Sequence, residues 1–254
     1  MNTAIKRISA LNYFGGKSRH LDWLLPLLDV PHTHYVEPFC GAASVFLNKK
    51  PSLIETISDA SGRLINFFRV LRERPEELIM LLELTPYSRG EWDVCREQSE
   101  DPLEDARRFF ALSMMSYGGR ICTGREVWRM SFTNSRHGVS MDAARMYRRI
   151  DGLLNVVARL RMAQIENRPA QMKEYLHEMT LEEHEALLYQ VKMCESHIAI
   201  SGYDSELYND HLRAVCGWQK HSGPLRQSNL GNKATREILW TNYIIDRQQN
   251  LFSS

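Results

Sequence analysis

A short turn of small residues, Gly41 to Ala43, follows the acidic residue Glu37. A phosphate-binding loop needs several glycines followed by a lysine and a hydroxyl residue, and a dinucleotide-binding loop needs three spaced glycines. The turn contains a single glycine, and a carboxylate beside it would repel a pyrophosphate. The turn therefore favours a ligand that offers hydroxyl groups or a cation over one that offers phosphates.

A second acidic residue, Asp59, lies 18 residues after Gly41. In open α/β sheets, ligands lie outside the carboxyl ends of the strands, and an acid about 20 residues after the glycine turn binds ribose hydroxyls. Taken alone, Glu37 or Asp59 is more often a helix cap or a surface charge. Together, beside small residues that admit a ligand to the backbone, they indicate an adenosine-like cofactor without a pyrophosphate. S-adenosylmethionine fits this description.

A strand–turn–helix–strand series must position these residues. We predict a strand that ends near Val36, a helix over residues 43–49, and a second strand, "SLIETISD", that closes on Asp59. The next segment predicts a helix, because its apolar residues recur at helical spacing. They are Leu64, Ile65, Phe68 and Leu71. Such a series is typical of an α/β sheet with crossover helices.

The remaining chain divides into a helical segment and a second mixed segment. Residues 75–161 are almost wholly helical in pattern, apart from a glycine- and arginine-rich stretch at 118–139, and we interpret them as an inserted lobe. Afterwards "MAQIEN" predicts a returning strand, and "TLEEHEALLYQVK" predicts a helix with Thr180 and Glu183 as its capping box. "HIAISGY" predicts a buried strand, and "KATREILWTNY" predicts one more strand.

The basic residues are unevenly distributed. The net charge is only +1, yet arginines gather between residues 118 and 161. They are Arg120, Arg125, Arg129, Arg136, Arg145, Arg148, Arg149, Arg159 and Arg161. Such a lobe can contact phosphates while the rest of the chain stays neutral. On charge alone, a solvated helix face is an equally good explanation.

Composition narrows the class of protein. Apolar residues make up 43% and charged residues 25%, as in an ordinary globular protein, and 254 residues are enough for a large core. The five cysteines form no CxxC pair, so we expect reduced thiols and no disulfide framework or zinc site. No apolar run approaches the length of a membrane span, and no signal-peptide pattern is present, so we expect a cytoplasmic protein.

Four motifs in order resemble the Dam-like DNA adenine methyltransferases. They are "YFGGK" at 13–17, "VEPFCGAASVFLNK" at 36–49, "SDASGRLINFFRVLRERPEEL" at 58–78 and "ISGYDSELY" at 200–208. The resemblance implies a Rossmann-like S-adenosylmethionine methyltransferase sheet, formed by residues 1–74 and 162–254. It also implies a helical target-recognition lobe at 75–161, which binds double-stranded DNA.

The resemblance also implies roles for individual residues. Those similar to the family's cofactor-binding residues are Tyr13, Lys17, Glu37, Phe39, Gly41 and Asp59. The two aromatic residues have plain core packing as an alternative. In the arginine-rich stretch, the DNA contacts that we expect are Arg120, Arg125, Arg129 and Arg136. Family members often have glycine in place of Ala43, and a methyl group should be tolerated there if the backbone stays helical.

One motif of the family, Asp-Pro-Pro-Tyr, is absent from this sequence. In the family its acid and a proline carbonyl accept hydrogen bonds from the adenine amino group, and its tyrosine stacks on the flipped base. About thirty residues, a helix, a strand and a loop, are missing near 170–177. Either the sequence omits a segment, which the unspoiled neighbouring motifs favour, or the protein is a true deletion. In the first case, two sequence neighbours there should lie farther apart than a peptide bond allows.

Three functions follow from these motifs. The first is methylation of the adenine amino group in duplex DNA, in a phage or a restriction–modification setting. The second is an inactive homologue that binds DNA or cofactor as a regulator or decoy. The third is methylation of RNA or another amine. The arginine-rich lobe and the extent of the resemblance favour DNA.

Overall fold

The structure is a computed structural model, which describes residues 7–121, 127–131, 133–136, 139–167, 180–227 and 234–245. The chain forms two units by its contacts. The first unit consists of Met1–Arg19 and His32–His177, and the second consists of His20–Pro31 and Glu178–Ser254. No helix in the described ranges is long and apolar enough to cross a membrane.

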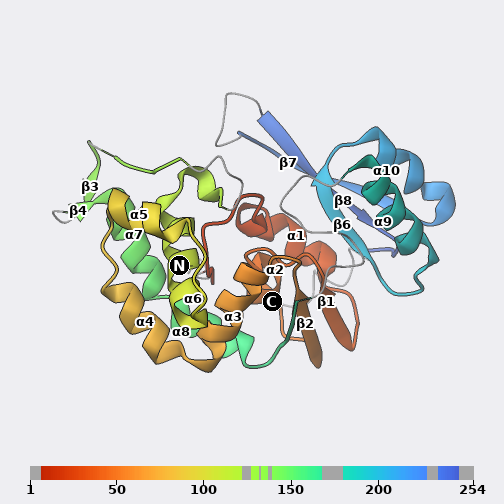
Figure 1. The fold of residues 1–254 in the computed structure, drawn as a ribbon. Helices are drawn as coiled ribbons and strands as arrows, with labels where there is room; N and C mark the ends of the chain where they lie inside the picture. Colours follow the sequence, from red (N-terminus) through yellow and green to blue (C-terminus); the bar gives the residue numbers. More distant parts are fainter. Residues whose placement is uncertain are drawn as a thin grey trace, which may run out of the picture. The chain divides into compact units, whose positions relative to one another are not determined.

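Three parallel strands form the sheet of the first unit (Figure 1). They are β1 (His34–Glu37), β2 (Ile54–Ser58) and β5 (Gln164–Glu166), in the order β1-β2-β5. Glu37 is in register with Ile57, and Ser58 with Glu166. Because parallel strands end at one edge, Glu37 and Asp59 lie at the same carboxyl edge of the sheet. The three strands predicted in this part of the sequence are confirmed.

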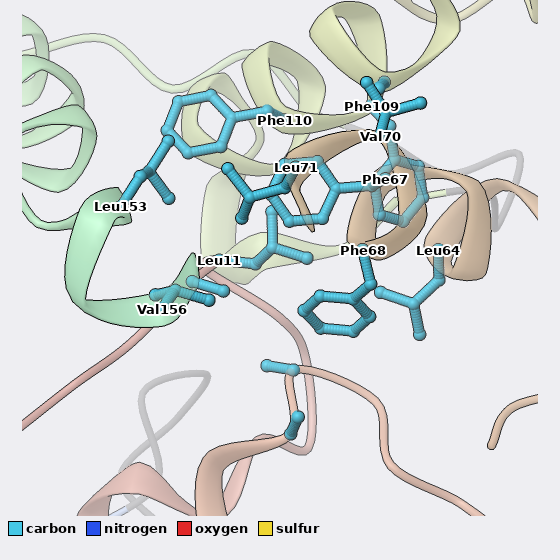
Figure 2. Packing of buried hydrophobic residues seen from close by; sticks show 14 of the residues in the cluster. Leu11, Leu64, Phe67, Phe68, Val70, Leu71, Phe109, Phe110, Leu153 and Val156 are labelled. Carbon is cyan, nitrogen blue, oxygen red and sulfur yellow. The ribbon is translucent and has the colours of Figure 1, made fainter. Parts of the chain in front are cut away.

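Helix α3 (Gly62–Glu73) carries the apolar face that the spacing predicts. Its first turn is capped by Ser61, whose hydroxyl accepts a hydrogen bond from the amide of Leu64 at 3.4 Å. The four predicted core residues of this helix are buried, and Phe67 stacks on Phe110 with ring centroids 6.0 Å apart. Figure 2 shows Phe67 and Phe110 packed with Leu71 in one cluster.

The helical segment after α3 shares this core. It contains α4 (Pro75–Glu83), α5 (Arg89–Cys95), α6 (Pro102–Met115), α7 (Met141–Ile150) and α8 (Leu153–Leu160), with the short strands β3 (Ser135–Arg136) and β4 (Val139–Ser140). Helix α6 packs along α3, and the ion pair Arg63–Asp105, at 2.9 Å, joins the two. Leu153 of α8 faces the same cluster (Figure 2). The helical character predicted for 75–161 is therefore confirmed.

The second unit contains an antiparallel sheet of β6 (Ala199–Tyr203), β8 (Ala234–Thr241) and β7 (Gln219–Gln227), in the order β6-β8-β7. Its helices are α1 (Leu21–Leu28), α9 (Leu181–Met193) and α10 (Glu206–His211). The capping box of Thr180 and Glu183 is confirmed at the start of α9. Among the described residues, these strands pair with one another and not with β1, β2 or β5.

One prediction for the second unit is wrong. The strand "HIAISGY" is not buried: the side chains of β6 range from partly to fully exposed. The reason is its position, because β6 is an edge strand of the described sheet and β8 lies at its centre. The burial is concentrated instead on Ile238, Leu239 and Trp240 of β8.

Candidate functional site

Glu37, at the end of β1, caps the helix that follows the turn. Its Oε2 atom accepts hydrogen bonds from the amide of Phe46 at 3.0 Å and from the hydroxyl of Tyr35 at 3.1 Å. Helix α2 (Ser44–Asn48) has no side-chain cap of its own, because Ala43 occupies the N-cap position. A carboxylate at this place satisfies an amide of the first turn and complements the helix dipole.

The Glu37 carboxyl is ionised less readily than an ordinary glutamate. Burial raises its pKa to about 7, against the hydrogen bonds from Tyr35 and Phe46 and the charge of Lys49, all of which lower it. The side chain is half-buried. A carboxyl that titrates near neutral pH is typical of functional sites, although structural groups also show it.

Asp59, just after β2, holds the turn itself. Its Oδ2 atom accepts a hydrogen bond from the amide of Gly41 at 3.0 Å, and its Oδ1 atom accepts one from the amide of Ser61 at 3.0 Å. The amide of Cys40 also donates to the Ser58 carbonyl at 2.9 Å. Burial raises the pKa of Asp59, whereas its hydrogen bonds with backbone amides lower it. The turn is therefore fixed to the end of the neighbouring strand.

The backbone conformation at Gly41 favours glycine, because its φ of +48° lies in the left-handed region. A Cβ there would lie 3.4 Å from Cε1 of the Tyr13 ring, at the edge of ordinary contact. Tyr13 lies in a segment that another glycine holds in place. The amide of Phe14 donates to the Gly119 carbonyl at 3.0 Å, and a Cβ on Gly119 would lie 2.6 Å from the Asn12 carbonyl oxygen.

The backbone at Ala43 differs from the expectation. Its φ of 51° and ψ of 34° are left-handed, so the condition that this residue stays in a right-handed helical conformation is not met. The amide of Ala43 donates to the Cys40 carbonyl at 2.7 Å, which closes the turn in this conformation. For an L-residue the left-handed conformation costs about 1–2 kcal/mol. The glycine that family members often carry here would avoid that cost.

The six predicted cofactor residues lie in the following places. The Tyr13 ring packs against Gly41, and the amide of Gly41 donates to Asp59. Glu37 and Asp59 both lie near the Cys40 thiol. Burial raises the pKa of that thiol most, and the charges of Asp59 and Glu37 raise it further. Lys17 begins the 3-10 helix η1 (Lys17–Arg19), which contacts α2. Phe39 is partly exposed beside the turn. Cys40 lies inside the motif, and its side chain is buried.

A network of charged side chains connects α2 to β2 and α8. Arg159 of α8 donates to the Phe46 carbonyl at 2.7 Å and pairs with Glu55 at 2.8 Å, and Lys49 pairs with Glu55 at 2.7 Å. Burial opposes the charge of Glu55, but the hydrogen bonds from Arg159 and Lys49 outweigh it and lower its pKa. No spacing in the sequence indicates this network, because its members come from three separate elements.

The four arginines predicted to contact DNA have different surroundings. The Arg120 guanidinium lies over the Phe14 ring, 4.8 Å from its centroid. Arg129 donates through Nε to the buried Asp142 at 2.7 Å, so part of its charge is already neutralised within the protein. Arg125 lies outside the described residues, and Arg136 is described only as backbone in β3.

The fragment that contains the turn also matches a known family. Residues 13–121 match the family of D12 class N6 adenine-specific DNA methyltransferases. The resemblance that the motifs indicate is confirmed. This D12 methyltransferase segment contains β1, the turn, β2 and α3, and it ends near the start of the arginine-rich stretch. The motif at 200–208 lies outside it.

A curated relative gives a second, shorter match. The type II methyltransferase M1.LlaDCHI of Lactococcus lactis subsp. cremoris is 35% identical over 68 residues, which is 27% of this chain and 24% of the relative. The chain therefore matches about a quarter of the length of that relative. The junction predicted between Ala170 and His177 falls outside the described residues, so the question of an omitted segment stays open.

Proposed function

We propose that the chain is an S-adenosylmethionine-dependent methyltransferase that acts on the exocyclic amino group of adenine in duplex DNA. The observation that supports this most is the hydrogen bond from Gly41 to Asp59 within the D12 methyltransferase segment. This bond places Asp59, at the end of β2, directly beside the glycine turn that follows the neighbouring strand β1. That relative is a type II methyltransferase by name, and we extend a restriction–modification setting to this chain as part of the proposal. Neither comparison supports a phage setting.

The residues at the turn fit this cofactor. The Asp59 carboxylate interacts with the backbone amides of Gly41, Ser61 and Ala60. An ionised carboxylate has about four lone-pair sites, so it can still accept a ribose hydroxyl. Gly41 presents backbone without a side chain, next to the Tyr13 ring. We therefore assign the cofactor to a site formed by Tyr13, Lys17, Glu37, Phe39, Gly41 and Asp59. When bound, S-adenosylmethionine supplies an electrophilic methyl group.

The chain's own residues orient and enclose that site. Glu37 fixes the first turn of α2 and so holds the turn at the carboxyl edge of the sheet. Reaction at a base requires that the base leaves the duplex stack, and positioning then contributes most of the rate enhancement. We propose that residues 1–74 and 162–254 form the Rossmann-like core. Residues 75–161 form the DNA recognition lobe, with Arg120, Arg125, Arg129 and Arg136 as contacts.

A second function is favoured by one specific observation. The Asp-Pro-Pro-Tyr tetrapeptide, which grips the adenine amino group in the family, does not occur in the sequence. A homologue that binds cofactor or DNA without transferring the methyl group, as a regulator or decoy, accounts for this directly. No residue of this chain is assigned to hold the adenine amino group.

A methyl-transfer assay with labelled S-adenosylmethionine separates these functions. We expect label to appear in duplexes that contain adenine and not in duplexes whose adenines are replaced by 2-aminopurine, which lacks the 6-amino group. Calorimetry on the same preparation measures cofactor binding. Binding without transfer supports the inactive homologue, and the absence of both rejects the cofactor site. Transfer to RNA duplexes in place of DNA identifies the third function.

A further inference from the structure

A concave surface of the first unit has four arginines among its nine lining residues. The cavity has a volume of about 640 Å³ and lies between the N-terminal segment, the end of α7 and the start of α8. Its lining includes Arg7, Arg145, Arg148, Arg149, Gly152 and Asn155. We call it the arginine cavity. None of its residues belongs to the turn or to the arginines assigned above to DNA contacts.

The three arginines that α7 contributes to the arginine cavity have little compensation from acidic side chains among the described residues. Arg145 reaches Asp142 only at 3.9 Å, and that carboxylate is already bonded to Arg129 at 2.7 Å. Within the described part of the chain, Arg148 forms no ion pair with an acidic residue. Arg149 is half-buried and donates to the Ser9 carbonyl at 3.0 Å, which is a neutral partner.

Burial and neighbouring like charges lower the pKa of two of these arginines. Burial lowers the pKa of Arg149, and the charges of Arg145 and Arg148 lower it further. Burial also lowers the pKa of Arg145, with Arg129 and Arg148 adding to the effect and Asp142 opposing it. Arginines in the last turn of a helix interact favourably with the helix dipole, and this explains in part why Arg148 and Arg149 lie at the end of α7. It does not account for Arg145, which lies about one turn earlier on α7, or for Arg7 of the N-terminal segment.

The start of α8 adds a second favourable feature. Gly152 occupies its N-cap position without a side-chain hydrogen bond, and Asn155 lies in its first turn. The N-terminus of a helix favours a negative charge through its amides and its dipole. Guanidinium groups bind phosphate oxygens in a planar, often bidentate arrangement. The arginines and the helix N-terminus in the lining of the cavity thus suit a phosphate group as the ligand.

We propose that the arginine cavity binds a phosphate group, supplied by the backbone of the DNA. The choice of DNA rests on the proposed function, whereas the affinity for phosphate does not. The cavity then anchors the duplex through its backbone and carries no sequence information. The hydrogen bond from Arg149 to Ser9 and those between Ile8 and Asn48, at 2.8 and 2.9 Å, connect the cavity to the end of α2. Such an anchor would fix the register of the duplex relative to the turn.

The first arm of the test measures binding of inorganic phosphate. Thermal unfolding is compared in sodium phosphate and in sodium chloride at equal ionic strength, for the full chain and for Arg148→Gln and Arg145→Gln/Arg148→Gln. We expect phosphate to raise the melting temperature of the native chain by a few degrees beyond chloride. The double variant should lose most of this rise without being less stable in chloride, because a repulsion is removed. The control Arg161→Gln, an exposed arginine at the end of α8, should keep it.

The second arm measures duplex DNA affinity at several salt concentrations. If the backbone is the source, Arg148→Gln should flatten the dependence of log affinity on log salt by about one unit, and Arg161→Gln should leave it unchanged. Stabilisation by phosphate with an unchanged DNA salt slope supports a phosphate site for a free anion and overturns the DNA source. Equal behaviour of phosphate and chloride, with equal salt slopes for all variants, overturns the proposal. Loss of methyl transfer alone bears on the proposed function and not on this site.

Discussion

The carboxylate of Asp59 accepts the amide hydrogen of Gly41 at 3.0 Å, so the end of β2 holds the turn that follows β1. The same carboxylate accepts the amide of Ser61 at the start of α3. One side chain therefore connects the turn, the strand and the following helix. This arrangement explains how an acid at this position supports the shape of the turn.

Replacement of Asp59 tests the cofactor assignment. Asp59→Ala should weaken S-adenosylmethionine binding by about 1–3 kcal/mol, because charge-assisted hydrogen bonds are lost. Calorimetry measures the affinity, at a temperature where circular dichroism shows the variant folded. The exposed Asp93 in the same matched segment offers the control Asp93→Ala, which should bind normally. Equal affinities for native chain and Asp59→Ala would count against the assignment.

The left-handed backbone at Ala43 predicts an unusual response to glycine. Ala43→Gly relieves about 1–2 kcal/mol of strain, but it loses a buried methyl group worth about 0.8 kcal/mol and gains chain entropy in the unfolded state. We expect a nearly neutral effect on the free energy of unfolding. Ala42→Gly, at a buried position without a positive φ, has no strain to relieve and should destabilise by about 1–2 kcal/mol. Urea denaturation of both variants measures the difference, and equal losses would refute the strain.

Glu37 makes stability depend on pH in a defined direction. Its pKa is raised from 4.5 to about 7 on folding, so between these values the folded state binds more protons than the unfolded state. Stability therefore falls as pH rises from about 4.5 to about 7, by up to about 3 kcal/mol. Glu37→Gln should remove this contribution, and the exposed Glu83→Gln should not. The quantity to compare is the difference in unfolding free energy from native chain at each pH; a difference that is flat with pH contradicts the prediction.

The buried Arg159 predicts a large loss of stability. Arg159→Ala leaves Glu55 with Lys49 and the Ser52 amide and frees the Phe46 carbonyl. Removal of one partner of a buried ion pair costs about 3–5 kcal/mol. Arg161→Ala, exposed at the end of the same helix, should cost little. Chemical denaturation gives both values. A loss below about 1 kcal/mol for Arg159→Ala would show that the network is weak.

Substitution of Arg120 and of Arg129, in the arginine-rich stretch, should affect DNA binding and stability differently. Arg120→Ala should flatten the salt dependence of DNA binding by about one unit if its guanidinium meets a phosphate. Arg129→Ala should lower affinity and also destabilise the fold, because it abandons the buried Asp142. Fluorescence anisotropy with a labelled duplex and thermal unfolding separate these effects. DNA binding that is indifferent to both substitutions rejects this surface.

The sequence predicts the elements around the turn well, because each ends at a strong local signal. Strand β1 ends just before Pro38 and strand β2 just before Asp59, although both strands mix polar with apolar residues, and the capping box of Thr180 is a purely local pattern. Strand β7 was not predicted. Its sequence is polar and contains Gly223 and Pro224, and the register shift between Ser222 and Leu225 falls at these two residues.

Other features depend on contacts between distant segments. The left-handed conformation of Ala43 is set by the tight turn that the Cys40 carbonyl closes, and local preference for an alanine points to a helix. The network of Glu55 and Arg159 and the arginine cavity both join residues that are about a hundred or more positions apart. The ion pair of Arg129 with Asp142 likewise neutralises a charge that the number of arginines in the sequence counts as available for DNA.

The close approach of Gly119 to Asn12 limits how this protein can diversify. A side chain at position 119 would strike the backbone of the segment that carries Tyr13, since its Cβ would lie 2.6 Å from the Asn12 carbonyl oxygen. The φ of +68° at Gly119 adds a second barrier to replacement. We expect substitutions in the arginine-rich stretch to be tolerated after this residue, whereas position 119 itself should accept glycine alone.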